Sequence, residues 1–233
     1  MIELCLFCFN ELIPQVGWSA VFLKKTPKPL CAICEGRFSK ISGETCKKCD
    51  RPFTNVNDKF KKNGHCLDCI RWEEDRKWAG ILVKNYSSVI YNDFAQEVIA
   101  RYKYRGDYIL ANVLAFFIKE KLNTIEFDAI CPIPLSENRL YERSFNQSEA
   151  IILACGHKPS MFLKRTHAEK QSKKSRSERI RLPQVFQTEG DIRAGHILLI
   201  DDIYTTGSTL RHAAKVLKEA GVHSVSSLTF ARG

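Results

Sequence analysis

The chain of 233 residues has no apolar run that approaches the roughly 20 residues of a membrane-spanning helix. Its first ten residues, MIELCLFCFN, lack the basic stretch and the long apolar segment of a secretory signal. Acidic residues are also few, since 26 Asp and Glu stand against 36 Lys and Arg, and the net charge is +10. We therefore predict a cytoplasmic protein without a membrane span, whose partners are polyanions, either nucleic acids or phosphorylated small molecules.

Cysteine, by contrast, is abundant, and eight of the ten cysteines form four Cys-x-x-Cys pairs within the first 69 residues. Such pairs are typical of zinc sites with four thiolate ligands and no open coordination position, which are structural rather than catalytic. Sequential pairing predicts two Zn²⁺ sites, as in a double zinc ribbon: Cys5, Cys8, Cys31 and Cys34, then Cys46, Cys49, Cys66 and Cys69. An interleaved arrangement would use the same eight residues.

Thiol exchange is the other chemistry that this motif serves, but it uses one pair at the start of a helix rather than four pairs in series. His65 adjoins Cys66, yet eight thiolates complete two sites without it. Cys131 and Cys155 lie outside the pairs, and we predict that they are small buried residues.

Two parts of different character follow one another along the chain. We predict a cysteine-rich zinc domain over residues 1–75 and a larger domain over residues 76–233. In the larger part the hydrophobic pattern predicts a strand or hairpin over 83–91, helices over 93–103, 109–122 and 147–154, and strands over 127–135, 197–200 and 224–230. The alternation predicts an α/β domain with a parallel sheet covered on both faces, and such sheets bind ligands beyond the carboxyl ends of their strands.

The segment HILLIDDIYTTGSTL, residues 196–210, carries the most chemistry. Its apolar run predicts a buried strand that ends at two adjacent acids, Asp201 and Asp202. A turn and a helical pattern follow, made of Thr205, Thr206, Gly207, Ser208 and Thr209, then Leu210, Ala213, Ala214 and Leu217. Helix N–H groups and hydroxyls bind anions, and carboxylates accept hydrogen bonds from sugar hydroxyls. The alternative is that the acids begin an ordinary turn and Thr205 caps the helix.

This segment resembles the phosphoribosyl pyrophosphate (PRPP) signature of the type I phosphoribosyltransferases, an apolar run, two acids, two spacer residues and T-T-G-x-T. The resemblance implies that Asp201 and Asp202 contact the ribose hydroxyls and are the catalytic residues of any transfer reaction. It further implies that residues 205–209 surround the 5′-phosphate and that Mg²⁺ accompanies PRPP. Tyr204 departs from the signature, which more often has an aliphatic residue there.

The same resemblance assigns roles to two further segments. The loop and helix start of PIPLSENRLYERSFNQ, residues 132–147, would hold pyrophosphate through Ser136, Arg139, Arg143, Asn146 and Gln147. The basic stretch beyond it lies where these transferases carry a mobile lid, and its cations would meet pyrophosphate or nucleic-acid phosphates: Lys170, Lys173, Lys174, Arg176 and Arg179. An ordinary surface helix and a solvated basic loop are the alternatives.

Several motifs follow one another along the chain: the four cysteine pairs, YKYRGD, PIPL, RSFNQ, QSKKSRSER and IDDIYTTGSTL. Together, and in this order, they resemble the ComF family of competence proteins, of the ComFC type. The resemblance implies a role in natural transformation, where incoming single-stranded DNA is handled beside a ComFA-like helicase and the recombination mediator DprA. Ser144 replaces the glycine of the more usual R-G-F-N-Q, which is unfavourable if this position needs a positive φ.

Three functions are compatible with these features. The first is a PRPP-binding protein of DNA uptake, with or without transfer to an unidentified acceptor. The second is a non-enzymatic adaptor for single-stranded DNA, in which the anion seat is vestigial or holds a DNA phosphate. The third is a salvage-type transferase acting on a free base. Aromatic side chains that could stack on such a base are those of Tyr86, Tyr91, Phe94 and Tyr104, although aromatic residues at these positions are better explained as part of the core.

Overall fold

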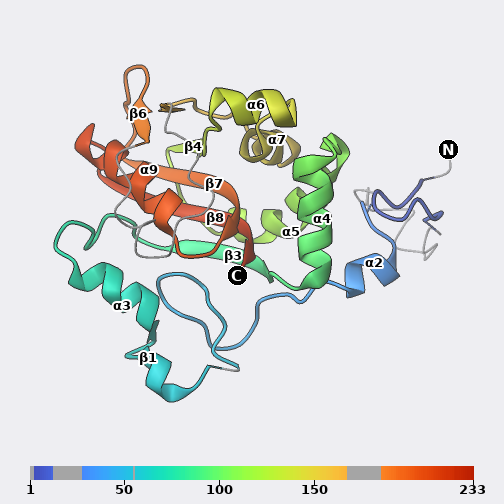
Figure 1. Ribbon diagram of the computed structural model, residues 1–233, viewed down its shortest axis with the longest axis horizontal. Coiled ribbons are helices and arrows are strands. Elements are labelled where there is room, and N and C mark those ends of the chain that lie inside the picture. The colour runs from blue at the N-terminus through green and yellow to red at the C-terminus, as the bar shows by residue number, and fades with distance from the viewer. Residues whose placement is uncertain (1–2, 13–27, 55, 167–184) are drawn as a thin grey trace.

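A four-stranded parallel sheet forms the centre of the molecule (Figure 1). The computed structural model describes residues 3–12, 28–54, 56–166 and 185–233. The strands lie in the order β3 (Asn85–Ile90), β8 (Ser224–Arg232), β7 (His196–Tyr204) and β4 (Ala129–Pro132). The predicted α/β domain with a parallel sheet is therefore confirmed.

Helices cover both faces of the sheet, because successive side chains of its central strand enter two different hydrophobic cores. Leu198 and Ile200 of β7 belong to the core on the side of α4, α5 and α7, whereas Ile197 and Leu199 belong to the core on the side of α9. These helices are α4 (Asp93–Tyr104), α5 (Ala111–Leu122), α7 (Gln147–Ala154) and α9 (Ser208–Glu219). Among the described residues, no helix has the length and apolar character needed to cross a bilayer.

Short elements complete the structure. In the cysteine-rich part they are α2 (Ala32–Gly36), η1 (Asp58–Phe60), β1 (Lys61–Lys62), β2 (His65–Cys66) and α3 (Leu67–Glu74). Around the sheet they are η2 (Tyr108–Leu110), α6 (Glu137–Arg143), β5 (Leu163–Arg165) and β6 (Phe186–Thr188). β5 and β6 pair as an antiparallel hairpin on the two sides of the basic stretch.

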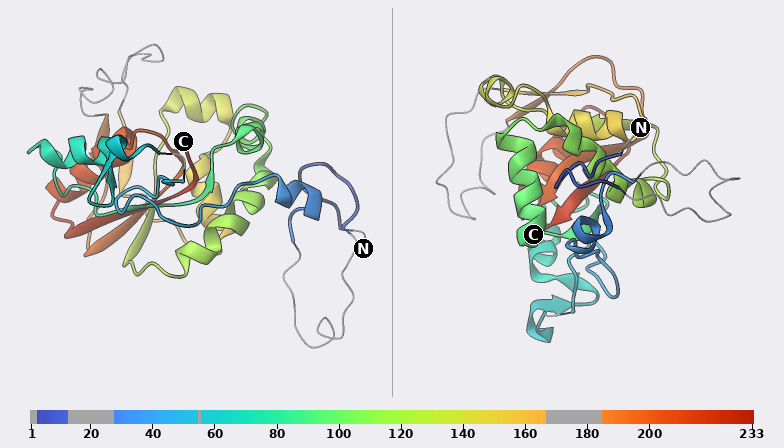
Figure 2. Two further views of the ribbon diagram at one scale, coloured as in Figure 1. Left: turned by 90° about the horizontal axis from the view of Figure 1, so that it is seen from below. Right: turned by 90° about the vertical axis from the view of Figure 1, so that its right-hand side faces the viewer.

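The cysteine-rich segments pack against the sheet and its helices at two separate places, as the blue and cyan ribbons of Figure 2 show. Phe38 enters the core of α4 and α5, whereas Phe53 enters the core on the α9 side. Asp50, which is 4% exposed, attaches the segment that contains Phe53 to the sheet and to α5. Its carboxylate accepts a hydrogen bond from the backbone N–H of Ser87 at 3.1 Å and pairs with Lys121 Nζ at 2.8 Å. The domain boundary at residue 75 stays a prediction.

The central strand is longer than the sequence predicts. The expectation that Asp201 and Asp202 end it was wrong, since β7 continues through both acids to Tyr204. The reason is the neighbouring strand, because β8 extends far enough to pair Ala231 with Ile203 and Arg232 with Tyr204. The acids therefore lie on a regular strand, which restricts their backbone more than a loop would.

Candidate functional site

The eight paired cysteines form two clusters of four sulfur atoms. The first cluster is Cys5, Cys8, Cys31 and Cys34, and the second cluster is Cys46, Cys49, Cys66 and Cys69. Within each cluster the Sγ atoms all lie within 4.8 Å of one another. The arrangement is the sequential one, and the interleaved one is not formed.

The spacing of the sulfur atoms fits a tetrahedral metal ion. Zn–S bonds of about 2.3 Å place the ligand sulfurs of a tetrahedral site about 3.8 Å apart. The Sγ atoms of Cys8 and Cys31 are 3.7 Å apart, and so are those of Cys49 and Cys66. The backbone N–H of Cys66 also points at Cys46 Sγ, at 3.3 Å, which stabilises a thiolate there. Both clusters could hold a metal ion, and their geometry is consistent with zinc.

The other cysteines and His65 lie outside these clusters. Cys131 is fully buried, as predicted, and burial raises the pKa of its thiol to about 12. Cys155 is only partly buried, so the prediction of a buried residue was wrong there; burial still raises the pKa of its thiol to about 11. His65 Nδ1 lies 3.0 Å from the carbonyl oxygen of Asn63, and the ring belongs to neither cluster.

The chain between β7 and α9 makes a tight turn that we call the anion loop (residues 204–209). Gly207 has a φ of +76° and immediately precedes α9, so the first N–H groups of the helix face the loop. The Thr206 hydroxyl accepts a hydrogen bond from the N–H of Ser208 at 3.4 Å. A small hollow open to solvent is lined by Asp201, Ile203, Tyr204, Thr205, Thr206, Gly207, Ser208, Thr209 and Leu210. The predicted anion-binding turn thus borders a small hollow, and its role in binding an anion stays a prediction.

Tyr204 and Arg211 form the floor of this loop. The Tyr204 hydroxyl accepts a hydrogen bond from Arg211 Nη1 at 2.5 Å, and burial raises the pKa of Tyr204. A Cβ atom on Gly207 would overlap Tyr204 Oη and Arg211 Nη1. Only glycine fits there, and the aromatic residue that departs from the signature is part of the loop's support.

Asp201 lines the hollow, and Asp202, the next residue of β7, lies in different surroundings. Asp201 Oδ1 accepts hydrogen bonds from Ser148 Oγ at 3.4 Å and from the N–H of Asp202 at 2.9 Å. Burial, and then the charge of Asp202, raise the pKa of Asp201 to about 7. Asp202 is 5% exposed and forms an ion pair with Lys103 of α4. Both carboxylates are therefore held in place by neighbouring elements.

The loop predicted to hold pyrophosphate divides into two kinds of residue. Asn146 caps α7, because its side chain accepts hydrogen bonds from the backbone N–H of Ser148 and of Glu149. Gln147 is 2% exposed and accepts a hydrogen bond from Arg143 Nη1 at 2.9 Å. Asn146 and Gln147 therefore hold the fold and orient Arg143, instead of presenting their own side chains to solvent.

Ser136, Arg139 and Ser144 occupy the two ends and the outer surface of α6. Ser136 is the N-cap residue and Arg139 is exposed. Ser144 follows α6 with a φ of +65°, so the position does require the left-handed conformation in which glycine is favoured. The role of these residues in binding pyrophosphate stays a prediction.

Two cations near the acids were not assigned to the site from the sequence. Lys103 reaches Asp202 from α4, and Arg165 of β5 lies near Asp201. Burial lowers the pKa of Arg165, the charge of Arg139 lowers it further, and Asp201 raises it. The predicted lid or nucleic-acid contacts Lys170, Lys173, Lys174, Arg176 and Arg179 lie outside the described residues.

A parallel sheet whose central strand carries two acids and leads into an anion loop defines a protein with a phosphoribosyltransferase-type domain. The family model described as "Phosphoribosyl transferase domain" matches residues 149–233. Competence protein ComFC of Bacillus subtilis (strain 168) is 36% identical to the chain, over 98% of this chain and 95% of that protein. The ComFC of Streptococcus pneumoniae (strain ATCC BAA-255 / R6) is 33% identical, over 98% and 99%. The chain belongs to the ComFC family of competence proteins.

Two further relatives match the chain over a smaller share of its length or at a lower identity. The DNA utilization protein YhgH of Escherichia coli O157:H7 is 30% identical over 105 residues, which are 42% of this chain and 46% of that protein. Competence protein F of Haemophilus influenzae (strain ATCC 51907 / DSM 11121 / KW20 / Rd) is 21% identical over 87% of this chain and 96% of that protein.

Proposed function

We propose that this chain is a cytoplasmic competence protein that binds PRPP with Mg²⁺ in the anion loop and handles single-stranded DNA during natural transformation. The observation that carries the proposal is that β7 leads from Asp201 and Asp202 directly into the anion loop at the N-terminus of α9, where Asp201 and the loop line one hollow. The names of its relatives, which are competence and DNA utilization proteins, support the biological setting.

Each part of the site has a place in this proposal. Asp201 and Asp202 accept hydrogen bonds from the ribose hydroxyls, and the N–H groups at the start of α9 bind the 5′-phosphate. Arg143, already oriented by Gln147, faces the pyrophosphate. Mg²⁺ would be held largely by pyrophosphate and ribose oxygens and by water, and it would neutralise part of their negative charge.

The two cysteine clusters bind Zn²⁺ in this proposal and stabilise the fold. Single-stranded DNA, a ComFA-like helicase and DprA are the partners that the role in transformation implies. Whether transfer chemistry accompanies binding is tested by product analysis after incubation with PRPP and candidate acceptors, free bases and single-stranded DNA included.

Calorimetric titration of the full chain with PRPP in Mg²⁺ buffer tests the proposal. We expect Asp201→Ala and Asp202→Ala each to weaken binding at least about tenfold, since each removes an acceptor of charge-assisted hydrogen bonds. Asp191→Ala is the matched control, because Asp191 is 69% exposed and pairs only with Arg193 among the described residues. Binding that is absent, or equal in all four proteins, removes PRPP from the proposal.

A second function, that of a DNA adaptor without PRPP chemistry, is favoured by one surface. Tyr104 at the end of α4 is 76% exposed and Tyr141 of α6 is 90% exposed. The Arg143 guanidinium lies 5.7 Å from the centre of the Tyr104 ring. Exposed aromatic rings beside arginines are suited to stacking on the bases of a single strand.

Fluorescence anisotropy with labelled single-stranded DNA separates the two functions. If this surface binds DNA, Tyr104→Ala with Tyr141→Ala lowers the affinity about tenfold or more, since stacking contributes about 1–3 kcal/mol per base. Leu153→Ala, at a half-exposed position of α7, is the control. Affinity that persists in the double variant and does not change with salt excludes the adaptor at this surface.

A further inference from the structure

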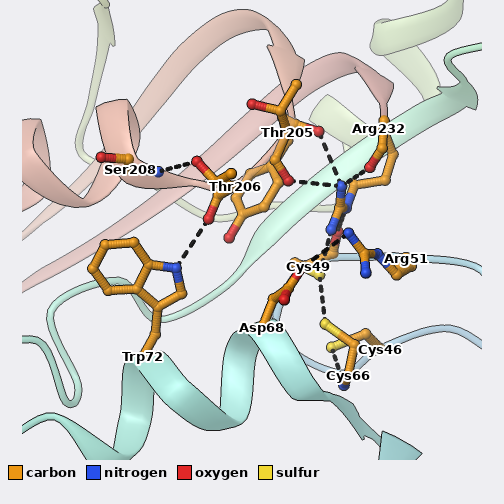
Figure 3. A network of polar contacts seen from close by, with 12 residues as sticks. Cys46, Cys49, Arg51, Cys66, Asp68, Trp72, Thr205, Thr206, Ser208 and Arg232 are labelled. Carbon is orange, nitrogen blue, oxygen red and sulfur yellow. Dashed lines mark hydrogen bonds and ion pairs between the residues drawn. The ribbon is translucent and has the colours of Figure 1, made fainter. Parts of the chain in front are cut away.

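The second cluster lies directly beneath the anion loop (Figure 3). Helix α3 begins at Leu67, between two of the cluster's ligands, Cys66 and Cys69. From the next turns of this helix Trp72 donates a hydrogen bond from its indole Nε1 to the carbonyl oxygen of Thr206, at 2.9 Å. The position of α3, and with it this hydrogen bond to the loop, is therefore set by the cluster.

Arg232 makes a second and more direct connection. Its Nε donates to the carbonyl oxygen of Cys49 at 3.0 Å, and its Nη2 donates to Cys49 Sγ at 3.3 Å. Its Nη1 donates to the carbonyl oxygens of Tyr204 and Thr205, at 3.1 and 3.0 Å. One planar guanidinium group thus contacts a cluster ligand and the first two residues of the anion loop, and it also donates to the carbonyl oxygen of Gly233.

Charge supports the same connection. Arg232 is 2% exposed, and among the described residues no Asp or Glu side chain forms an ion pair with it. A buried cation is costly unless an opposite charge lies nearby. Four thiolates around a divalent metal ion carry a net charge of −2, so the loaded second cluster places negative charge next to Arg232.

The floor of the loop extends this network to a third contact. Trp72 lies under the Arg211 guanidinium, whose carbon is 4.8 Å from the ring centre, and Arg211 in turn holds the Tyr204 hydroxyl. A Cβ atom on Gly207 would overlap the two side chains of this floor. The backbone carbonyl groups of Tyr204, Thr205 and Thr206 therefore all accept hydrogen bonds from Arg232 or Trp72, on the side of the loop that faces the second cluster.

The first cluster has no such relation to the loop among the described residues. Its neighbour Phe7 packs edge to face on Phe94 of α4, with ring centres 4.8 Å apart, and the Phe7 carbonyl accepts a hydrogen bond from Arg101 at 2.9 Å. The first cluster therefore braces α4, and the second cluster braces the anion loop.

We propose that Arg232 and Trp72 are positioning residues through which the second cluster, loaded with a metal ion, fixes the backbone of the anion loop. Metal occupancy of this cluster then controls the order of the loop and, through it, the affinity for a phosphorylated ligand. The effect on affinity rests on the proposed PRPP site, whereas the effect on loop order does not.

Hydrogen exchange of the loop amides, read by mass spectrometry on the full chain, is the test. Arg232→Gln keeps an amide donor but removes the charge and the fork of donors. We expect it to speed exchange in residues 203–209 at least tenfold, and Trp72→Phe to speed it about threefold. Arg193→Gln, at an 87% exposed arginine, and Trp78→Phe, in the ring that packs edge to face on Trp72, are the matched controls.

Metal content and ligand binding are measured on the same proteins. Zinc per chain is expected to stay at the wild-type value in Arg232→Gln, while PRPP affinity falls about tenfold. Removing metal from the wild-type chain with a chelator is expected to speed loop exchange as Arg232→Gln does. If either substitution abolishes folding, as judged by circular dichroism, Arg232→Lys, which keeps the charge and loses the fork, replaces Arg232→Gln and Trp72→His replaces Trp72→Phe.

The outcomes separate this inference from the proposed function. Unchanged loop exchange in the Arg232 variant with wild-type zinc content overturns the inference, whatever PRPP does. Faster loop exchange in a protein whose wild type does not bind PRPP keeps the inference and overturns the proposed ligand.

Discussion

Lys103 and Asp202 form an ion pair that joins α4 to the central strand of the sheet, one residue beyond Asp201, which lines the hollow. Their side chains are only 17% and 7% exposed, so water screens the pair poorly. The pair holds the end of α4 beside Asp202, and at the same end of this helix the guanidinium of Arg143 lies 5.7 Å from the centre of the exposed Tyr104 ring.

Breaking this pair on one side should destabilise the protein. Lys103→Met leaves the buried Asp202 carboxylate without its cation, and we expect a loss of about 2 kcal/mol in the free energy of unfolding. The double variant Lys103→Met with Asp202→Asn should recover most of it, because neither position of the pair then carries a charge. Urea unfolding measures both, and Arg193→Met, at an exposed ion pair, should change little. A single variant as stable as the wild type contradicts the prediction.

Asp201 should make stability fall as the pH rises. Burial raises its pKa to about 7 from the ordinary 3.8, so between these values the folded protein keeps a proton that the unfolded chain has released. Stability from this group is full below pH 3.8 and declines as the pH rises towards 7.

Asp201→Asn removes this titration. We expect the variant to be about 2 kcal/mol more stable than the wild type at pH 8 and nearly equal to it at pH 4. Urea unfolding at the two pH values measures the difference, with Asp191→Asn as the exposed control. If the difference in the free energy of unfolding between Asp201→Asn and the wild type is the same at both pH values, the pKa of Asp201 is not raised.

Gly207 should tolerate no side chain. Gly207→Ala adds a Cβ atom that overlaps Tyr204 Oη at a φ of +76°, so we expect a loss of at least about 2 kcal/mol in the free energy of unfolding together with weaker PRPP binding. Gly190→Ala is the matched control, since its φ is +75° and its Cβ meets nothing within 4 Å. It should cost only about 1 kcal/mol, measured by the same unfolding assay. Equal losses of stability in the two variants would show that the side chains of Tyr204 and Arg211 move aside for the new Cβ atom.

Ser144→Gly should stabilise the protein. The position has a φ of +65°, where a side chain costs roughly 1–2 kcal/mol and glycine costs mainly backbone entropy, so we expect a gain of about 0.5 kcal/mol. Ser136→Gly, at the other end of α6 with a φ of −69°, should be neutral or destabilising. Thermal unfolding compares the two, and a loss of stability in Ser144→Gly would refute the prediction.

Local pattern was enough to predict much of the fold. Helix α7 (Gln147–Ala154) has the predicted bounds, and α4 ends within a residue of its predicted end at Lys103, because helical spacing of apolar residues is a property of the segment itself. The sequential cysteine clusters were equally accessible, since ligand spacing is local as well.

Features that depend on a distant partner were not predicted. Strand β7 runs past its acids because β8 offers backbone partners, and no pattern within residues 197–204 reveals that. The roles of Lys103, Trp72 and Arg232 depend on tertiary contacts in the same way. One signal was present in the sequence, however, because Arg211 falls beside Ala214 at the margin of the helix's apolar face, where a buried charge needs a polar partner.

The hydrogen bonds between Arg232 and Cys49 join positions that are 183 residues apart in the chain. On a ribosome that adds about 5–20 residues per second, the cysteine would emerge roughly 10–40 s before the arginine. The second cluster can therefore gather its ligands early in synthesis, while the contact that locks it to the loop must wait for the last strand. Folding of this protein is expected to finish late and cooperatively, with an early metal-bound intermediate that is not yet able to hold a phosphate.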